Sequence, residues 1–251
     1  MTRTIDTAMV LAAGLGTRMR PLTEDRPKPL IKVRGKSLVD HALDDLARAG
    51  VSKAVVNVHY LADMAEAHLA LRETPRIAIS DERAELKETG GGLAQARALL
   101  GGDGPVFCTN TDQVFVDGAG GPAAKRLLDA FDPDEMDALL LLQPREKTSG
   151  YDGVGDFALD AAGRLQRRGD APSAPYVFTG LQILDLKLLD GAPDGPFSTN
   201  LLWNKALDAG RLFGMVHDGE WMHVGSPDGL KDAERRLADL LDGQDRQSAN
   251  G

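Results

Sequence analysis

A glycine-rich loop near the N-terminus holds the residues best suited to chemistry. It reads LAAGLGTRMRPLT over residues 11–23 and follows an apolar run. Glycines at positions 14 and 16 let the backbone approach a ligand closely and expose successive N–H groups, which attract anions. Thr17 adds a hydroxyl donor, and the planar guanidinium of Arg18 suits phosphate oxygens. These residue types in this order predict a cradle for a polyphosphate.

The segment PKPL at residues 27–30 supplies a second cation, Lys28, between two prolines that stiffen its backbone. Two common phosphate-binding motifs do not fit this region. A dinucleotide fingerprint requires a glycine where Met19 stands, and a P-loop ending in Gly35-Lys36-Ser37 requires one where Leu30 stands. The remaining alternative is an ordinary glycine-rich turn with surface cations. Because the glycines and both cations follow a predicted strand, we favour the polyphosphate cradle.

A carboxylate follows another apolar run, at residues 106–109. The run is succeeded by Asn110, Thr111 and Asp112. Mg²⁺ prefers oxygen ligands and is often shared with substrate phosphates, so a carboxylate at a strand end beside a phosphate cradle suits this ion. The alternative is an aspartate that caps a turn. Asp112 is therefore a candidate metal ligand.

Short apolar runs and amphipathic stretches alternate over the first 150 residues. Continuous apolarity is typical of strands that are covered on both faces. We expect strands at residues 7–13, 53–58, 76–80, 106–109 and 138–143, and helices at 38–49, 61–71, 93–100 and 123–131. This alternation predicts a largely parallel sheet with helices on both faces, in which ligands bind beyond the carboxyl ends of the strands.

After about residue 150 the pattern becomes richer in strands. We expect a hairpin at 157–160 and 165–168, strands at 176–184, 212–217 and 221–224, and helices at 201–209 and 227–241. These elements complete one α/β domain over residues 1–241, with a mixed, mostly parallel twisted sheet. Residues 242–251 are polar and are predicted to form a disordered tail.

Composition narrows the class of protein further. The 251 residues include 29 Lys and Arg against 38 Asp and Glu, a formal net charge of −9 at pH 7. This balance argues against nucleic acid or an anionic membrane as a partner. The aliphatic runs are too short to cross a bilayer, and the N-terminus lacks a secretory pattern. The one cysteine, Cys108, cannot form an internal disulfide. We expect a soluble, cytoplasmic protein.

The compound motif LAAGLGTRMRPLT with PKPL closely resembles the signature of the sugar-1-phosphate nucleotidylyltransferases, and the similarity covers residues 7–241. Supporting segments are Glu88-Thr89-Gly90-Gly91-Gly92, Gly155-Asp156-Phe157 and Phe178-Thr179-Gly180. The resemblance implies a glycosyltransferase-A-like fold, which has a Rossmann-like core and a small sugar-binding β lobe. It also implies a nucleotide-binding half at residues 7–150 and a sugar-phosphate-binding half at 151–241.

The resemblance implies a role for individual residues in the first half. Arg18 would assist the leaving pyrophosphate, Lys28 would bind the phosphate under attack, and Asp112 would hold Mg²⁺; these three are the catalytic candidates. The segment from Glu88 would lie against base and ribose, or would simply form the N-terminal turn of a helix. The nucleotide-binding candidates are Leu11, Ala12, Ala13, Gly14, Gly16, Thr17, Arg18, Glu88, Gly90 and Gly91.

At the sugar end the resemblance implies contacts from Asn110, Gly155, Asp156, Arg168 and Gly180, with Arg168 or Lys147 facing the anionic side of the sugar phosphate. The second metal-binding aspartate of the family is replaced by His223 in the segment WMHVGS. Imidazole is a poorer partner for Mg²⁺ than carboxylate. Three outcomes are open: His223 binds a softer metal, a carboxylate such as Asp218 or Asp228 substitutes, or Asp112 acts with waters and phosphates alone. We favour the third, with His223 contacting phosphate or water.

The activity implied by the resemblance is transfer of a nucleotidyl group from a nucleoside triphosphate to a sugar 1-phosphate, with release of pyrophosphate. The short chain is most similar to the uridylyltransferases that use N-acetylmuramate 1-phosphate in bacterial cell-wall recycling. One alternative is a mannose-1-phosphate guanylyltransferase or another NDP-hexose pyrophosphorylase. Another is an inactive, nucleotide-binding regulatory protein. We expect small-molecule substrates, Mg²⁺ as cofactor, no nucleic-acid or membrane partner, and a monomer or small homo-oligomer.

Overall fold

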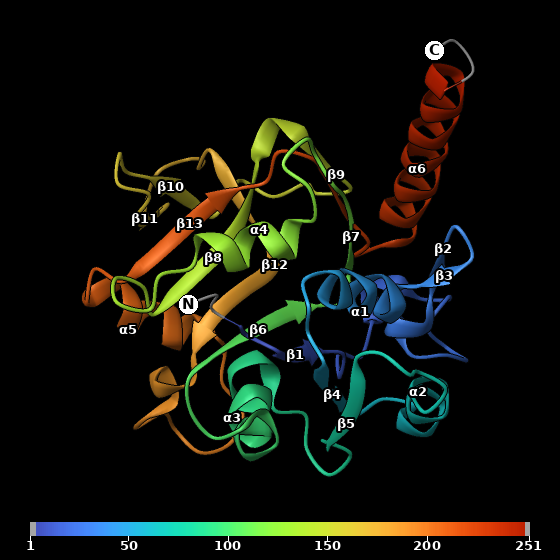
Figure 1. Cartoon of the computed structure of the whole chain (residues 1–251). Helices are drawn as coiled ribbons and strands as arrows, with labels where there is room; N and C mark the ends of the chain where they lie inside the picture. The colour runs from blue at the N-terminus through green and yellow to red at the C-terminus, as the bar shows by residue number, and fades with distance from the viewer. Residues whose placement is uncertain (1–3, 249–251) are drawn as a thin grey trace.

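A nine-stranded mixed sheet forms the centre of the molecule in the computed structural model (Figure 1), which describes residues 4–248, with side chains up to Leu240. Its strands are β1 (Thr7–Leu11), β4 (Lys53–Val58), β5 (Arg76–Asp81), β6 (Pro105–Asn110), β8 (Ala138–Pro144), β10 (Phe157–Leu159), β11 (Leu165–Arg167), β12 (Tyr176–Asp185) and β13 (Leu212–Val216).

The main sheet has a parallel part and an antiparallel part, which are joined by hydrogen bonds into one continuous sheet. Strands β6, β1, β4 and β5 run parallel in that order, and β12 pairs antiparallel with both β6 and β8. Strand β13 continues the sheet parallel to β8, and β10 and β11 form a hairpin beside β12. The predicted mixed, mostly parallel sheet is therefore confirmed, and the second half of the chain extends it.

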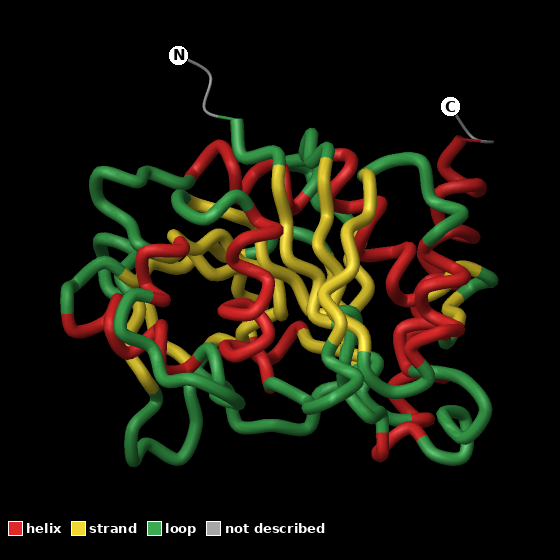
Figure 2. Tube along the Cα trace, turned by 90° about the horizontal axis from the view of Figure 1, so that it is seen from below, coloured by secondary structure: helices red, strands yellow, loops and turns green. Residues whose placement is uncertain are grey.

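Helices lie on both sides of the strands (Figure 2). Alternate residues of β1 point to opposite faces, so Ala8 and Val10 belong to one apolar core and Met9 to the other. The first core includes α1 (Leu38–Arg48) and α4 (Ala123–Ala130), and the second includes α3 (Glu88–Leu100) and α5 (Asn200–Asp208). Helix α2 (Ala62–Leu69) packs beside β4.

Smaller elements complete the described part of the chain. Strands β7 (Gln113–Val116), β14 (Glu220–His223) and β9 (Thr148–Ser149) form a second sheet, and β2 (Lys32–Val33) and β3 (Lys36–Ser37) form a third. Short 3-10 helices are η1 (Thr17–Met19), η2 (Lys28–Leu30), η3 (Arg145–Lys147) and η4 (Leu186–Leu189). Helix α6 (Pro227–Ser248) projects from the body (Figure 1). Among residues 4–248, no helix is long and apolar enough to cross a membrane.

The structure corrects the sequence predictions at three places. Helix α3 begins at Glu88, five residues before the predicted start at 93, because the glycines at 90–92 are buried inside its first turns. Helix α6 continues to Ser248, so the predicted disordered tail is wrong for residues 242–248; several good helix formers there extend it. The last three residues of that tail lie outside the described residues. The strand predicted at 221–224 is confirmed as β14, but its partners β7 and β9 were not predicted, because they are only four and two residues long.

A β-bulge in β12 connects the main sheet to the second sheet. The pairing of β12 with β8 shifts register between Phe178 and Gln182, around Gly180 with a φ of 93°. The carbonyl of Thr179 in this bulge accepts a hydrogen bond of 2.9 Å from the indole N–H of the buried Trp221 on β14. The bulge thereby fixes β14 against the main sheet.

Replacing Trp221 with Phe should leave the buried carbonyl of Thr179 without its donor. An unsatisfied buried polar group costs about 1–3 kcal/mol, so the free energy of unfolding should fall by that amount in a urea titration. Tyr60→Phe is a suitable control, because the hydroxyl of half-buried Tyr60 donates to Thr23 and Glu24 carbonyls near the surface. An unchanged free energy of unfolding in Trp221→Phe would contradict the role given to this bond.

Candidate active site

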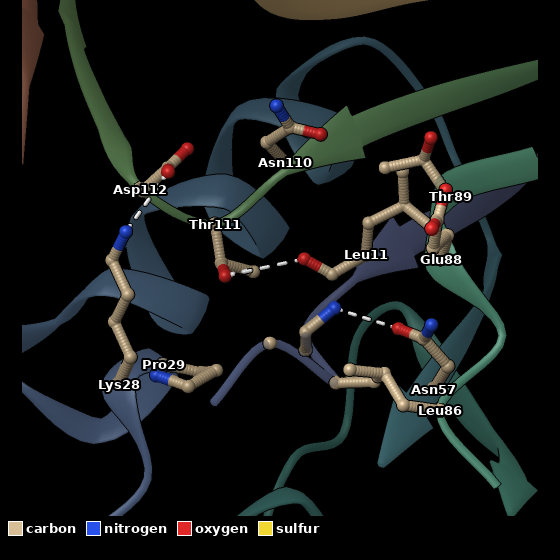
Figure 3. Close-up of a pocket in the computed structure, with 13 residues that line it drawn as sticks. Leu11, Lys28, Pro29, Asn57, Leu86, Glu88, Thr89, Asn110, Thr111 and Asp112 are labelled. Carbon is tan, nitrogen blue, oxygen red and sulfur yellow. Dashed lines mark hydrogen bonds and ion pairs between the residues drawn. The ribbon is translucent and has the colours of Figure 1, made fainter. Parts of the chain in front are cut away.

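A cleft opens at the carboxyl ends of β1, β4 and β6, where the parallel topology predicts a ligand site. Figure 3 shows Lys28 and Asp112 at one end of it and Glu88 and Thr89 at the other. The lining residues are Leu11, Ala12, Ala13, Gly14, Lys28, Pro29, Asn57, Leu86, Glu88, Thr89, Asn110, Thr111 and Asp112.

Lys28 and Asp112 form an ion pair of 2.9 Å although 84 residues separate them. Lys28 begins the short helix η2, whose first position is preceded by Pro27 in an extended conformation. Burial alone would raise the pKa of Asp112, but the hydrogen bond with His223 and the charge of Lys28 outweigh it and hold that pKa below its usual value. The carboxylate is therefore ionised at neutral pH, beside an ammonium group that can bind phosphate.

His223 faces the same carboxylate from the second sheet. Its Nε2 lies 3.6 Å from Asp112 Oδ2, and its Nδ1 lies 3.3 Å from the Gly150 carbonyl. A carbonyl and a carboxylate can only accept, so both ring nitrogens of His223 face hydrogen-bond acceptors, with Nε2 directed at Asp112. The Val224 N–H also donates to the Asp112 carbonyl at 2.8 Å, which holds the two segments together.

The other end of the cleft is built from the start of α3. Glu88 is exposed, lines the cleft, and has a φ of 58°, in the left-handed region that residues with a Cβ rarely adopt. The hydroxyl of Thr89 accepts a hydrogen bond of 2.9 Å from the Thr199 N–H. Such strain persists where surrounding structure imposes it and is often found at functional positions. The structure thus brings the predicted nucleotide contact Glu88 into the cleft.

Gly90 and Gly91 do not line the cleft. Their N–H groups donate to the Phe197 carbonyl at 2.8 and 3.0 Å, and a Cβ on Gly90 would lie 2.4 Å from the Phe197 ring. Because they lack a side chain, these glycines allow the loop before α5 to pack directly against α3. The expected contact of their backbone with base or ribose competes with this existing partner and stays a prediction.

The glycine-rich loop splits its predicted residues between two hollows. Gly14 lines the cleft and has open space around its Cα, whereas Gly16, at a φ of 63°, lies where a Cβ would meet Lys28 and Thr23 at 3.0 Å. Arg18 lies outside the cleft. It lines an adjoining hollow with His223 and the start of α6, and no ion pair engages it within the described residues. Thr17 is exposed in η1.

The predicted sugar-side residues are more dispersed. Asn110 lines the cleft, and Gly180 lies beside it, since a Cβ on Gly180 would be 3.1 Å from Asn110 Cβ. Asp156 accepts the Phe178 N–H at 2.9 Å, and Arg168 donates to the Ala171 carbonyl at 2.6 Å. Burial raises the pKa of Asp156. Gly155 is buried close to the Ala174 carbonyl, and Lys147 is exposed on η3. These four residues line no part of the cleft.

Among residues 4–240, whose side chains the structure describes, no group of three or more His, Cys, Asp or Glu is arranged to hold a metal ion. Asp218 is engaged with Arg126 and the Gly120 N–H, and Asp228 pairs with Lys231. Substitution by Asp218 is therefore not supported, while Asp228 lines the same hollow as His223.

Sequence reasoning missed several residues of the cleft. Asn57 is the clearest case: its Oδ1 accepts the Ala12 N–H at 2.6 Å, and its side chain is buried. The signal was a single amide in the otherwise apolar run KAVVNV, near the end of a strand. Thr111 is a second case, and its hydroxyl donates to the Leu11 carbonyl at 3.3 Å. Thr89 and Pro29 lie in segments that the sequence analysis singled out but were not named as contacts, and Leu86 had no distinguishing signal.

The α/β fold carries a charged cleft at the carboxyl ends of its parallel strands, and comparison with known proteins identifies the class. Residues 7–239 match the family described as nucleotidyl transferase, so the chain belongs to that family and is a nucleotidyltransferase. The predicted family resemblance is confirmed, and membership of a family of enzymes leaves the inactive regulatory alternative unsupported.

Individual relatives are more specific. The chain is 49% identical over 236 residues to the N-acetylmuramate alpha-1-phosphate uridylyltransferase of Caulobacter vibrioides, covering 92% of this chain and 97% of the relative. It is 34% identical to the protein of that name in Neisseria meningitidis serogroup B, covering 90% and 96%. The solved UDP-glucose pyrophosphorylase in complex with UDP-glucose shares the fold, with a TM-score of 0.77, 16% identity and coverage of 94% and 100%.

Two substitutions at Glu88 should separate backbone strain from the role of the carboxylate. Glu88→Gly and Glu88→Ala both remove the carboxylate, but only glycine relieves the left-handed conformation. A residue with a Cβ loses about 1 kcal/mol in this conformation, so Glu88→Gly should unfold with a higher free energy than Glu88→Ala by roughly that amount. Urea titrations measure the difference, and equal stabilities would show that position 88 is unstrained.

Proposed function

We propose that the protein transfers the uridylyl group of UTP to N-acetylmuramate 1-phosphate, forming UDP-N-acetylmuramate and pyrophosphate. The observation that carries this proposal is the 49% identity, over nearly the whole of both chains, to a relative named for that reaction. The cleft supports it, because Lys28 and Asp112 mark a phosphate end and Glu88 lies at the opposite end, where a base and ribose would lie.

The reaction needs no nucleophilic side chain. An oxygen of the sugar phosphate is ionised at neutral pH and attacks the α-phosphorus of UTP in line, while the bond to pyrophosphate breaks. The protein's part is to align the two phosphates and to neutralise the charge that moves onto the leaving group. In this proposal Lys28 would contact the phosphate under attack, and Arg18, which lines the adjoining hollow, would meet the leaving pyrophosphate.

The residues present fit one cation held mainly by substrate. Asp112 offers a hard carboxylate oxygen, and Mg²⁺ commonly takes only one or two protein carboxylates together with substrate phosphates and water. His223 directs Nε2 toward that carboxylate and would contact the phosphate or a water molecule. When bound, Mg²⁺ would withdraw charge from the triphosphate. Asp112 would hold it, and Lys28 would then shift from Asp112 to the phosphate.

The remaining expectations belong to this proposal. An acidic enzyme of small anionic substrates has no need of nucleic acid or a membrane surface, so we propose neither as a partner and propose a cytoplasmic enzyme. A monomer or small homo-oligomer is retained as the expected form. The alternative, a mannose-1-phosphate guanylyltransferase, shares the phosphate-binding chemistry. Relatives of that name are about 30% identical, more distant than the uridylyltransferases.

The proposal is tested by pyrophosphate release from the purified protein with Mg²⁺. UTP, GTP, dTTP and CTP are each combined with N-acetylmuramate 1-phosphate, mannose 1-phosphate and glucose 1-phosphate. Turnover confined to UTP with N-acetylmuramate 1-phosphate is the expected result. Turnover with GTP and mannose 1-phosphate instead would replace the proposed substrates while leaving the family intact.

Lys28→Ala should lower kcat by about 10²–10³, the loss typical of removing one preorganised charge-stabilising donor. Lys32→Ala, which removes an exposed lysine outside the cleft, should leave kcat unchanged. Steady-state rates of pyrophosphate release measure both variants. A kcat for Lys28→Ala within a few-fold of the parent would remove Lys28 from the mechanism.

A further inference from the structure

Two buried polar side chains beneath the cleft, Asn57 and Glu82, link its two walls. The Ala12 N–H in the glycine-rich loop donates to Asn57 Oδ1 at 2.6 Å, and Asn57 Nδ2 donates to Glu82 Oε1 at 2.7 Å. The second carboxylate oxygen, Oε2, accepts the Lys87 N–H at 3.1 Å, immediately before Glu88. An unbroken chain of three hydrogen bonds therefore runs from the phosphate loop to the start of α3.

The backbone groups at the two ends of this series of hydrogen bonds determine which side-chain atoms donate and which accept. Backbone N–H groups can only donate, so Ala12 requires an acceptor and Lys87 requires another. Asn57 must therefore present its oxygen to Ala12 and its NH₂ to Glu82. Glu82 must in turn present two acceptors, which a carboxylate does and a carboxamide does not. The two backbone groups thus require one amide and one carboxylate at positions 57 and 82.

The burial of Asn57 and Glu82 indicates that these hydrogen bonds are structurally important. Asn57 and Glu82 are 2% and 1% exposed, and a carboxylate is rarely so buried without full hydrogen bonding. Gly92 of α3 makes the room: a Cβ there would lie 2.7 Å from Glu82 Oε1 and 2.9 Å from Asn57 Nδ2. This packing explains why position 92 is a glycine. Gly90 and Gly91 instead leave room for the loop that contains Phe197.

We infer that Asn57 and Glu82 are positioning residues for the nucleotide, and that the hydrogen-bonded pair sets the separation between the phosphate loop at Ala12 and the base-side residue Glu88. Nothing in this pair reacts with substrate. It keeps the two contact regions of one ligand at a fixed distance, which is what a nucleotide that spans both requires. The inference rests on the proposed function only for the identity of that nucleotide.

A reciprocal exchange of residue types tests the inference. Glu82→Gln places an NH₂ group against that of Asn57 or the Lys87 N–H, and Asn57→Asp places two carboxylates together. The double variant Asn57→Asp/Glu82→Gln restores the pattern. In it, the new carboxylate at position 57 accepts from the Ala12 N–H and from the new amide at position 82, whose oxygen accepts from the Lys87 N–H.

Each single variant should raise the KM for UTP about tenfold, because each leaves one bond of the chain unmade or repulsive. The double variant should return the KM for UTP to within about twofold of the parent, since the two changes are coupled through one bond. The KM for the sugar phosphate should not change in any of the three variants. Steady-state rates of pyrophosphate release at varied UTP measure these values.

Gln182→Leu is the matched control, since it removes another buried hydrogen bond, from the Trp203 indole, away from the cleft lining. It should lower stability without changing the KM for UTP. Gly92→Ala is an independent probe: it favours the helix but intrudes on the pair, so it should weaken UTP binding. Failure of the double variant to recover, or an equal rise of KM in Gln182→Leu, would overturn the inference.

A readout without substrate separates this inference from the proposed function. Amide hydrogen exchange at Ala12 should be slow in the parent and the double variant and faster in both single variants. If no substrate pair in the pyrophosphate panel reacts, the proposed function fails, and the exchange rates still decide whether the pair holds the loop. Equal exchange at Ala12 in all four proteins would refute the pair's role.

Discussion

The cleft depends above all on the parallel pairing of β4, β1 and β6. Both faces of these strands are covered by helices, so their registers are fixed by burial on each side, and Leu11 comes to lie beside Asn110. The segments that leave the three strands therefore meet at one edge. There the Thr111 hydroxyl bonds the Leu11 carbonyl and the Asn57 amide bonds the Ala12 N–H. Every group proposed to contact the nucleotide is placed relative to that edge.

A second constraint brings the distant C-terminal region to the same edge. The bulge at Gly180 frees the Thr179 carbonyl for Trp221, and β14 then pairs with β7 directly after Asp112. As a result, Lys28, Asp112 and His223 gather from three segments that are far apart in the chain. The charges stabilise one another there: the ammonium group offsets the cost of partly burying the carboxylate, which in turn holds the ammonium ready for phosphate.

The two ends of the site differ in how completely they are formed. At the end near Glu88, buried side chains and backbone hydrogen bonds connect the glycine-rich loop with the start of α3. The sugar-side residues Asp156 and Arg168 instead bond within their own hairpin and its neighbours. The proposed reaction therefore depends on alignment of the two phosphates and on neutralisation of their charge. The strained residue Glu88 lies at the end of the cleft opposite Lys28 and Asp112.

The sequence by itself determined the fold class, the strands of the parallel sheet and the phosphate loop with Lys28 and Asp112, because these follow from local patterns: apolar runs, glycine spacing and charge near strand ends. Tertiary structure alone decided that Lys28 pairs with Asp112, that Arg18 faces a different hollow, and that the glycines at 90–92 admit Phe197 and the Asn57–Glu82 pair. The pairing of β14 with β7 and β9 was likewise decided only by the tertiary structure. Each depends on contacts between residues far apart in the chain, and no local periodicity or propensity encodes such distances.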